Sequence, residues 1–462
     1  MNEAARQGAP QIFQHAPGPV HLRSWPIDLL SWEALAGLAI GLLLVLGFAA
    51  HLTGGLAGLS WRLSCLAYAL VCLIRGVDWR QAGAMSVLWL PFLMSAAIDA
   101  AVLHSVAGVA DVARQLFIFG FAAIVFGAAR DRVARRVGVW ALFVAAGAIL
   151  AYTLVQTLPT LSSGWSYASA RMLKGKSFQS GFNANEVCFA ALVALLAGYR
   201  EALVPRWISL AMVVLTGLCS VLLGARAPAL ALLVGASAGL MIVRAPIWSA
   251  CARRRWLGSA ATALVTGGFL ALFFSYIDEI AHSAFAVHLA GRAALWQIAA
   301  GAWPQQPLFG FGPGTFQAVI HANLGKAHFS TVDEFDSLYA LQSGGFHNIW
   351  LSVLVERGTV GLLGLFASWC LLLGFALRHG GALLWPRRWV LFTVLASLFL
   401  RGQVELAGLF DDADGPINQI IMMALGLTLP RFAPVLRAPA FRGRDLAAQA
   451  AAQSGASKPA RP

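Results

Sequence analysis

Charged side chains inside long apolar runs are the residues of this sequence best suited to chemistry. An ionised group at the centre of a bilayer costs at least ~2.5–3.5 kcal/mol, so such residues are candidates for function. The candidates are Arg62, Asp99, Arg114, Glu186, Arg226, Arg401 and Glu405. Arginine suits phosphate, because its planar guanidinium can donate two hydrogen bonds at once.

Two polar segments in the second half of the chain carry further candidates. In the first, Arg292 and Trp296 precede the glycine run 310–314. Pro313 interrupts that run, so we interpret it as a tight turn after a helix that carries Arg292, not as a phosphate-binding loop. In the second, His347 precedes Asn348 and begins a helix. A histidine has an intrinsic pKa near ~6.5, which suits general-base chemistry, although position alone favours an interfacial residue.

The composition identifies the environment of these residues. Of the 462 residues, 59% are hydrophobic and 11% are charged, against roughly 25% charged in an ordinary soluble domain. These values exclude a disordered chain and a soluble globule. The net charge of +13 fits an excess of cations in cytoplasmic loops better than nucleic-acid binding. The six cysteines show no disulfide or metal-site spacing. We therefore expect a membrane protein with no metal ion and no nucleic-acid partner.

The apolar runs predict an all-α polytopic membrane protein with about twelve transmembrane helices, since a spanning helix needs about 20 apolar residues. The runs lie at 30–50, 56–74, 82–101, 110–129, 137–158, 184–200, 207–223, 227–243, 257–277, 358–377, 389–408 and 415–430. They are continuous and do not alternate with period two, which disfavours strands.

Lysine and arginine predict the orientation. Alternate connections carry 23 of the 33 basic residues, which places both termini in the cytoplasm. The predicted organisation is a cytoplasmic tail at 1–29, then spans 1–9 over 30–277 with an outer loop at about 159–183. A large, partly helical outer loop at 278–357 comes next. Spans 10–12 follow over 358–430, and 431–462 is a cytoplasmic tail predicted to be disordered.

In this threading almost every embedded charge lies near the outer ends of the helices. A transporter places such groups near the midplane, so the distribution favours a site at the outer leaflet. Its substrate would have a lipid tail and a charged head.

Structural roles remain open for these residues. Arg401 and Glu405 are four residues apart and could neutralise each other. Arg62 and Arg114 could be anchors that reach the membrane surface. Asp99 and Glu186 fit structural ion pairs better than catalytic groups.

The motifs together resemble the O-antigen ligase and polymerase superfamily. An arginine before a tryptophan-bearing helix is followed by P-x-x-G-x-G-x-G-x-F, then by His347-Asn348 and by Glu356-Arg357-Gly358-Thr359-Val360-Gly361. Gly181-Phe182-Asn183-Ala184-Asn185 precedes the sixth span, with Ala184 where many members have proline. Arg226 lies in the small-residue turn where the family has an arginine. The resemblance covers about 180–365 by motif and the rest by span count.

The resemblance implies a lipid-linked-donor (GT-C-like) glycosyltransferase architecture in the bacterial inner membrane, with its active site on the periplasmic side. The implied activity is metal-independent and inverting. It moves an O-antigen polysaccharide from undecaprenyl diphosphate to a hydroxyl of lipid A–core.

Residue by residue, the resemblance implies catalytic roles for His347, Arg292 and Arg226. We expect a second set to bind diphosphate or glycan, namely Arg62, Arg114, Arg401, Asn348 and Asn185.

Three rival functions remain at this point. An O-antigen polymerase would use the same donor with a lipid-linked glycan as acceptor. A protein O-oligosaccharyltransferase commonly carries a sizeable C-terminal soluble domain, whereas this tail has about 30 residues and looks unstructured. A lipid-linked glycan transporter is disfavoured by the scarcity of charge at the midplane.

Overall fold

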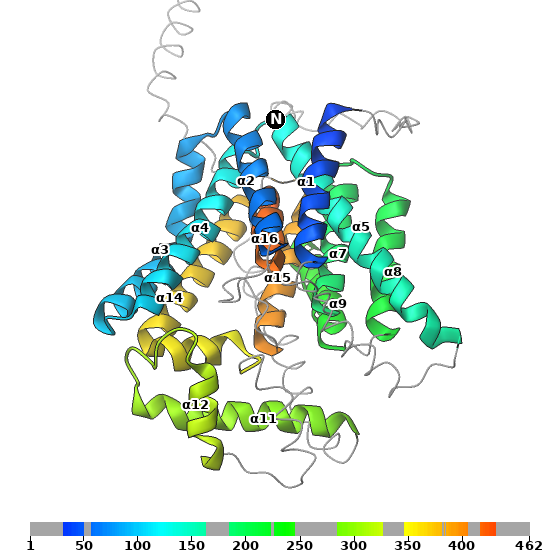
Figure 1. Cartoon of the computed structure of the whole chain (residues 1–462). Helices are drawn as coiled ribbons and strands as arrows, with labels where there is room; N and C mark the ends of the chain where they lie inside the picture. Colours follow the sequence, from blue (N-terminus) through cyan, green and yellow to red (C-terminus); the bar gives the residue numbers. More distant parts are fainter. Residues whose placement is uncertain are drawn as a thin grey trace, which may run out of the picture.

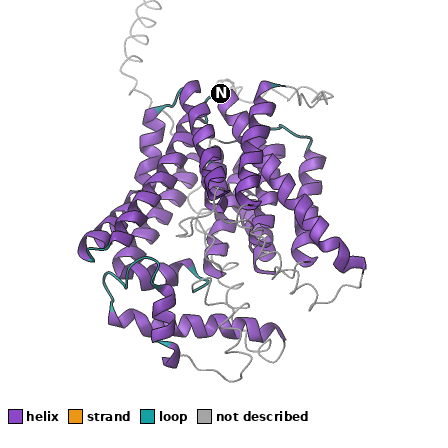
Figure 2. Ribbon diagram, viewed as in Figure 1, coloured by secondary structure: helices purple, strands orange, loops and turns teal. Residues whose placement is uncertain are grey.

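The computed structural model describes residues 31–49, 57–162, 184–222, 226–244, 284–326, 346–380, 383, 385–404 and 416–430. Every regular element in this part of the chain is a helix, and no strand is drawn among the described residues (Figure 2). The expectation of an all-helical protein is confirmed for these residues.

The helices form an upright bundle with a second layer across its lower end (Figure 1). In chain order the elements are α1 (Trp32–Ala49), α2 (Ala57–Arg75), α3 (Trp79–Val102), α4 (Val106–Ala128), α5 (Arg132–Ser162), α7 (Ala184–Leu195), the π-helical turn η2 (Leu196–Arg200), α8 (Arg206–Leu222), α9 (Arg226–Arg244), α11 (Ala284–Ala302), η4 (Trp303–Gln305), α12 (Phe316–Ala322), η5 (Leu324–Lys326), α14 (Ile349–Gly380), α15 (Trp385–Val404) and α16 (Pro416–Thr428).

Local signals in the sequence begin several of these helices. The Asp78 side chain accepts hydrogen bonds from the backbone N–H groups of Arg80 and Gln81 at 3.1 and 3.4 Å, and α3 begins there. The Ser105 hydroxyl accepts from the Gly108 N–H at 3.2 Å at the start of α4. Such caps satisfy N–H groups that the first helical turn leaves without partners.

Small residues let the helices approach closely. Gly235 and Gly239 of α9 face Ser397 and Thr393 of α15, where an added Cβ would lie 2.8 Å from the backbone nitrogen of each. Gly239 follows Gly235 by four residues, whereas its partner Thr393 precedes Ser397 by four residues. The two helices are therefore antiparallel. The first residues of α9 therefore lie beside the last residues of α15.

The second layer consists of α11, which lies across the lower end of the bundle, and the short α12 beside it (Figure 1). Leu295 and Ile298 of α11 and Ile320 of α12 are buried in one apolar cluster. Phe346 and Val355, on either side of the start of α14, belong to the same cluster. This cluster ties the segment around residues 284–326 to the bundle.

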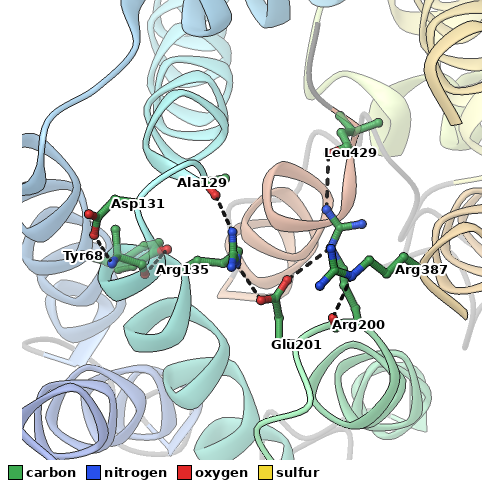
Figure 3. A network of polar contacts seen from close by, with 9 residues as sticks. Tyr68, Ala129, Asp131, Arg135, Arg200, Glu201, Arg387 and Leu429 are labelled. Atoms are coloured by element: carbon green, nitrogen blue, oxygen red, sulfur yellow. Dashed lines mark hydrogen bonds and ion pairs between the residues drawn. The ribbon is translucent and has the colours of Figure 1, made fainter. Parts of the chain in front are cut away.

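Arginine ion pairs hold the opposite end of the bundle together (Figure 3). Arg135 pairs with Glu201 at 2.6 Å, and the Arg387 Nε donates to the Arg200 carbonyl at 3.1 Å. Arg75 binds both oxygens of Asp131 at 3.1 Å. These four arginines belong to the alternate connections that the sequence groups on one side. The structure places these four at one end of the bundle. The full layout of the connections and the cytoplasmic identity of this end stay predictions.

Among the described residues, four helices are long and apolar enough to cross a membrane. They are Trp79–Val102, Val106–Ala128, Arg132–Leu158 and Ile349–Gly380. Shorter apolar helices include Trp32–Leu46, Phe189–Arg200, Arg206–Ser220 and Val234–Val243. Large apolar side chains such as Leu66, Ile74 and Leu363 remain 55%, 74% and 61% exposed. Lipid explains such surfaces better than water does, so the chain is a multi-pass membrane protein.

The count of twelve spans remains a prediction. The predicted span at 257–277 lies outside the described residues. The predicted start of the tenth span, residue 358, falls inside α14. That helix begins at Ile349, and Gly358 with φ 62° and ψ −162° makes a kink within it. The residues before Gly358 include polar ones, and such a stretch is typical of a loop, which explains the difference in the predicted start.

Candidate functional site

His347 and Asn348 form the turn that begins α14. The Asn348 Oδ1 accepts hydrogen bonds from the N–H groups of Trp350 and Leu351 at 2.9 and 3.1 Å, so Asn348 caps the helix. His347 has a positive φ of 49°. A non-glycine residue rarely adopts this conformation, and such positions cluster at functional sites.

Helix α11 is fastened to this turn. The Trp296 Nε1 donates a 3.1 Å hydrogen bond to the carbonyl of Phe346, the residue before His347. Arg292 lies four residues before Trp296, on the same face of α11. The Arg292 side chain is half-buried. The structure therefore brings together the elements that carry Arg292 and His347.

Arg401 comes to the same place from α15. Its side chain is 2% exposed, and its guanidinium lies 4.5 Å from the centre of the Phe189 ring of α7. The next residue, Gly402, is so close to α14 that an added Cβ would lie 2.9 Å from the Ile349 side chain. Ile349 is two residues after His347. The alternative pairing of Arg401 with Glu405 is untested, because Glu405 lies outside the described residues.

For Arg226 and Asn185, the structure describes the backbone position only. Arg226 is the first residue of α9. The antiparallel register with α15 puts it at the same end as Arg401, about 8 Å further out along the helix axis. Asn185 is the second residue of α7, one turn before Phe189. Their side chains lie outside the described part of the structure.

These elements meet at what we call the helix-end junction, formed by His347, Arg292, Arg401 and the first turns of α7 and α9. Six of the eight predicted site residues lie on it: Asn185, Arg226, Arg292, His347, Asn348 and Arg401. The remaining two, Arg62 and Arg114, lie elsewhere.

The glycine run docks against the kink of α14. The N–H groups of Phe311 and Gly312 donate to the carbonyls of Val355 and Glu356 at 3.0 and 2.8 Å. The N–H groups of Thr359 and Val360 donate to the carbonyls of Pro307 and Leu308 at 2.9 and 3.1 Å. The expected tight turn is confirmed, because Gly310, Gly312 and Gly314 all have positive φ.

Close backbone approach explains the spacing of glycines in both motifs. An added Cβ on Gly310 would lie 2.6 Å from the Arg357 nitrogen, and one on Gly358 would lie 2.6 Å from the Phe309 nitrogen. The Glu356 carboxylate accepts a 3.1 Å hydrogen bond from the Gly314 N–H. The two sequence motifs are thus two halves of one backbone crossing.

Arg357 is a buried charged residue at the point where the glycine run crosses α14. Its side chain is 1% exposed, its Nη2 lies 2.6 Å from Oδ2 of Asp111, and its guanidinium lies 4.6 Å from the Phe92 ring centre. The other oxygen of Asp111 pairs with Arg114. One carboxylate of α4 therefore binds two guanidinium groups.

Arg62 and Arg114 line a cavity of about 560 Å³ between α2, α4 and the glycine run. Its lining consists of Trp61, Arg62, Ala107, Ala110, Asp111, Arg114, Phe117, Pro313 and Gly314. The described lining includes no residue of the helix-end junction. The sequence predicts that these two arginines share a site with the residues of the junction, whereas the structure places them in a separate cavity.

Asp111 was not among the predicted site residues, and Arg357 had no predicted role. The available signal was the pair Asp111 and Arg114, three residues apart in an apolar run, a spacing that places opposite charges side by side on a helix. Within the described residues, no group of three His, Cys, Asp or Glu side chains could hold a metal ion.

Comparison with known proteins gives one family match. Residues 211–366 match the family model described as O-antigen ligase (Wzy_C). The matched segment runs from within α8 to the middle of α14, and it includes Arg226, Arg292, His347 and the glycine run. No curated protein matches the chain. For residues 211–366, this match confirms the resemblance to the O-antigen ligase and polymerase superfamily that the motifs indicate.

Proposed function

We propose that the protein is an inverting, metal-independent glycosyltransferase that moves O-antigen polysaccharide from undecaprenyl diphosphate to a sugar hydroxyl of lipid A–core. The family match indicates glycosyl transfer of the ligase or polymerase type. The observation that carries the assignment to residues is the helix-end junction. Helices far apart in the sequence, which carry three arginines and one histidine, converge there at one end of an apolar bundle.

The arginines of the junction supply positive charge to the leaving group. When the bond between the sugar and the diphosphate breaks, negative charge develops on the diphosphate. Arg292 and Arg226 would bind it, and Arg401 would add charge from the inner side of the junction. Arg401 is buried against Phe189, so its field is weakly screened by water. Preorganised donors of this kind typically contribute ~3–4 kcal/mol each to lowering a barrier.

His347 would act on the acceptor. Its imidazole accepts a hydrogen bond from the acceptor hydroxyl. As the hydroxyl oxygen attacks the anomeric carbon, the bond from that carbon to the diphosphate oxygen breaks, and the hydroxyl proton passes to the imidazole. The cap at Asn348 and the bond from Trp296 to Phe346 fix the backbone on both sides of His347. That fixed backbone supports a positioned base.

The surroundings favour lipid-linked substrates. The junction lies where α11 crosses the end of the bundle (Figure 1), opposite the arginine-rich end. If the arginine-rich end faces the cytoplasm, the junction faces the periplasmic side of the inner membrane. Both lipids could then diffuse to it within the membrane.

The test combines purified full-length protein with undecaprenyl-diphosphate-linked glycan and purified lipid A–core. The expected product is glycan on the core, in the presence of EDTA as well as in its absence. Longer lipid-linked chains without core product would mean a polymerase. Movement of lipid-linked glycan across a vesicle membrane without bond formation would mean a transporter. Activity lost in EDTA and restored by a divalent cation would contradict the metal-independent reaction.

A further inference from the structure

We infer that the cavity between α2 and α4 binds the phosphate head group of a membrane lipid, at a site separate from the helix-end junction. The cavity of about 560 Å³ falls in the usual range for small-molecule sites. It is large enough for a head group. The proposed transfer reaction does not involve this cavity.

The cavity wall carries excess positive charge. Its described lining contains two arginines and one aspartate, a net charge of +1. That aspartate, Asp111, is shared between Arg114 and the buried Arg357. Arg62 pairs with no carboxylate among the described residues, and its guanidinium lies 5.1 Å from the centre of the Trp61 ring. An anion is the ligand that such a wall favours, and guanidinium groups suit phosphate oxygens.

The cavity is amphipathic, which favours a lipid over a free anion. The rings of Trp61 and Phe117 line it beside the arginines. On the same two helices, Leu66 of α2 and Val109 and Leu116 of α4 are 55%, 62% and 55% exposed. An acyl chain could lie along this apolar surface while the head group occupies the cavity.

The packing of α2 against α4 explains why the cavity exists at this end. The two helices run parallel, because Tyr68 contacts Phe121 with ring centres 6.3 Å apart and Arg75 pairs with Asp131 at their far ends. Nearer their starts, Trp61 and Arg62 face Ala110 and Arg114 across the cavity. The glycine run closes one side of it with Pro313 and Gly314.

The cavity is distinct from the junction along α14. Arg357, which binds the cavity residue Asp111, follows His347 by ten residues, or about 15 Å along a helix. A lipid head group in the cavity therefore leaves the His347 turn accessible. Binding there can be measured without any glycan donor, so the result is independent of the proposed transfer reaction.

The experiment measures lipid binding to delipidated full-length protein in detergent by native mass spectrometry. Dioleoyl phosphatidic acid should bind more tightly than dioleoyl phosphatidylcholine, whose head group is zwitterionic. Arg62→Gln should weaken phosphatidic acid binding about tenfold, as expected for the loss of a charge-assisted hydrogen bond. Arg206→Gln is the matched control, because Arg206 is also exposed and lies 5.7 Å from an aromatic ring, that of Tyr199, at the other end of the bundle. It should leave binding unchanged.

A second pair of variants tests the cavity without changing charge. Ala110→Phe should fill the cavity and abolish the binding, whereas Ala113→Phe, on an exposed position of α4 outside the lining, should not. Unchanged phosphatidic acid binding in both Arg62→Gln and Ala110→Phe would overturn the inference. Equal affinity for dibutyryl phosphatidic acid, or full competition by inorganic phosphate at equal concentration, would also overturn it, since either result would identify a site for free phosphate.

Discussion

Arg357 donates a 2.6 Å hydrogen bond to Oδ2 of Asp111, although 246 residues separate the two in the sequence. The pair joins α14 to α4 at the level where the glycine run crosses α14. Both side chains are buried, so the charge of each depends on the other. This bond links the cavity that contains Arg62 and Arg114 to α14, the helix that follows the His347 turn.

Removing one member of this pair should destabilise the protein strongly. Asp111→Ala leaves a buried guanidinium without this carboxylate, and breaking a buried pair typically costs about 3–5 kcal/mol. The double variant Asp111→Leu with Arg357→Met should recover much of the loss. Thermal melting in detergent measures the effect. Glu33→Gln, which removes a partly exposed pair with Arg136 at 3.5 Å, should cost about 1 kcal/mol or less. Equal losses in Asp111→Ala and Glu33→Gln would contradict the prediction.

The backbone crossing predicts opposite effects for two glycines of α14. Gly358→Ala places a Cβ against the backbone of Leu308 and Phe309 at a positive φ, and the φ alone costs about 1–3 kcal/mol. Gly374→Ala meets nothing within 4 Å, and in a helix interior it should stabilise by about 0.5–1 kcal/mol. Melting temperatures of the two variants should therefore move in opposite directions. A stable Gly358→Ala protein would mean that the crossing is not tightly packed.

The sequence could predict which residues share an end of the bundle. Apolar runs predict the helices. Because successive connections lie on opposite sides of the membrane, the sequence predicts Arg226, His347 and Arg401 at one end. It could not predict the pairing of Arg357 with Asp111, because that contact depends on α14 packing beside α4. The glycine run was predicted as a turn, but its contact with α14 was not predicted. The backbone hydrogen bonds to Val355 and Glu356 leave no pattern in the side-chain types of the sequence. The sequence also could not show that Arg62 and Arg114 lie apart from the junction, because that separation depends on how the helices pack.

The turn between α4 and α5 gives a prediction about pH. Hydrogen bonds from Arg75 hold the pKa of Asp131 below its usual value. A carboxylate with a depressed pKa stabilises the folded state above its unfolded pKa, about 3.9, and this stabilisation is lost as the pH falls through the lower, folded pKa. Asp131→Asn should therefore melt at a lower temperature than the natural protein at pH 7, and the difference should shrink below about pH 4. A difference that stays constant down to pH 3 would mean that the ionised form of Asp131 contributes nothing.

His347 and Arg292 give the most direct test of the junction. His347→Ala should abolish glycan transfer to lipid A–core, because no other side chain of the turn can accept the hydroxyl proton. Arg292→Ala should lower the rate by about 10²–10³, the usual effect of removing one preorganised donor to a developing negative charge. His321→Ala is the matched control, since His321 is an exposed histidine at the end of α12, and its rate should be unchanged. The assay compares initial rates at equal amounts of folded protein, with melting temperatures measured in parallel. Near-normal transfer by either junction variant would remove that residue from the reaction, whereas equal losses in all three would indicate damage to the layer formed by α11 and α12.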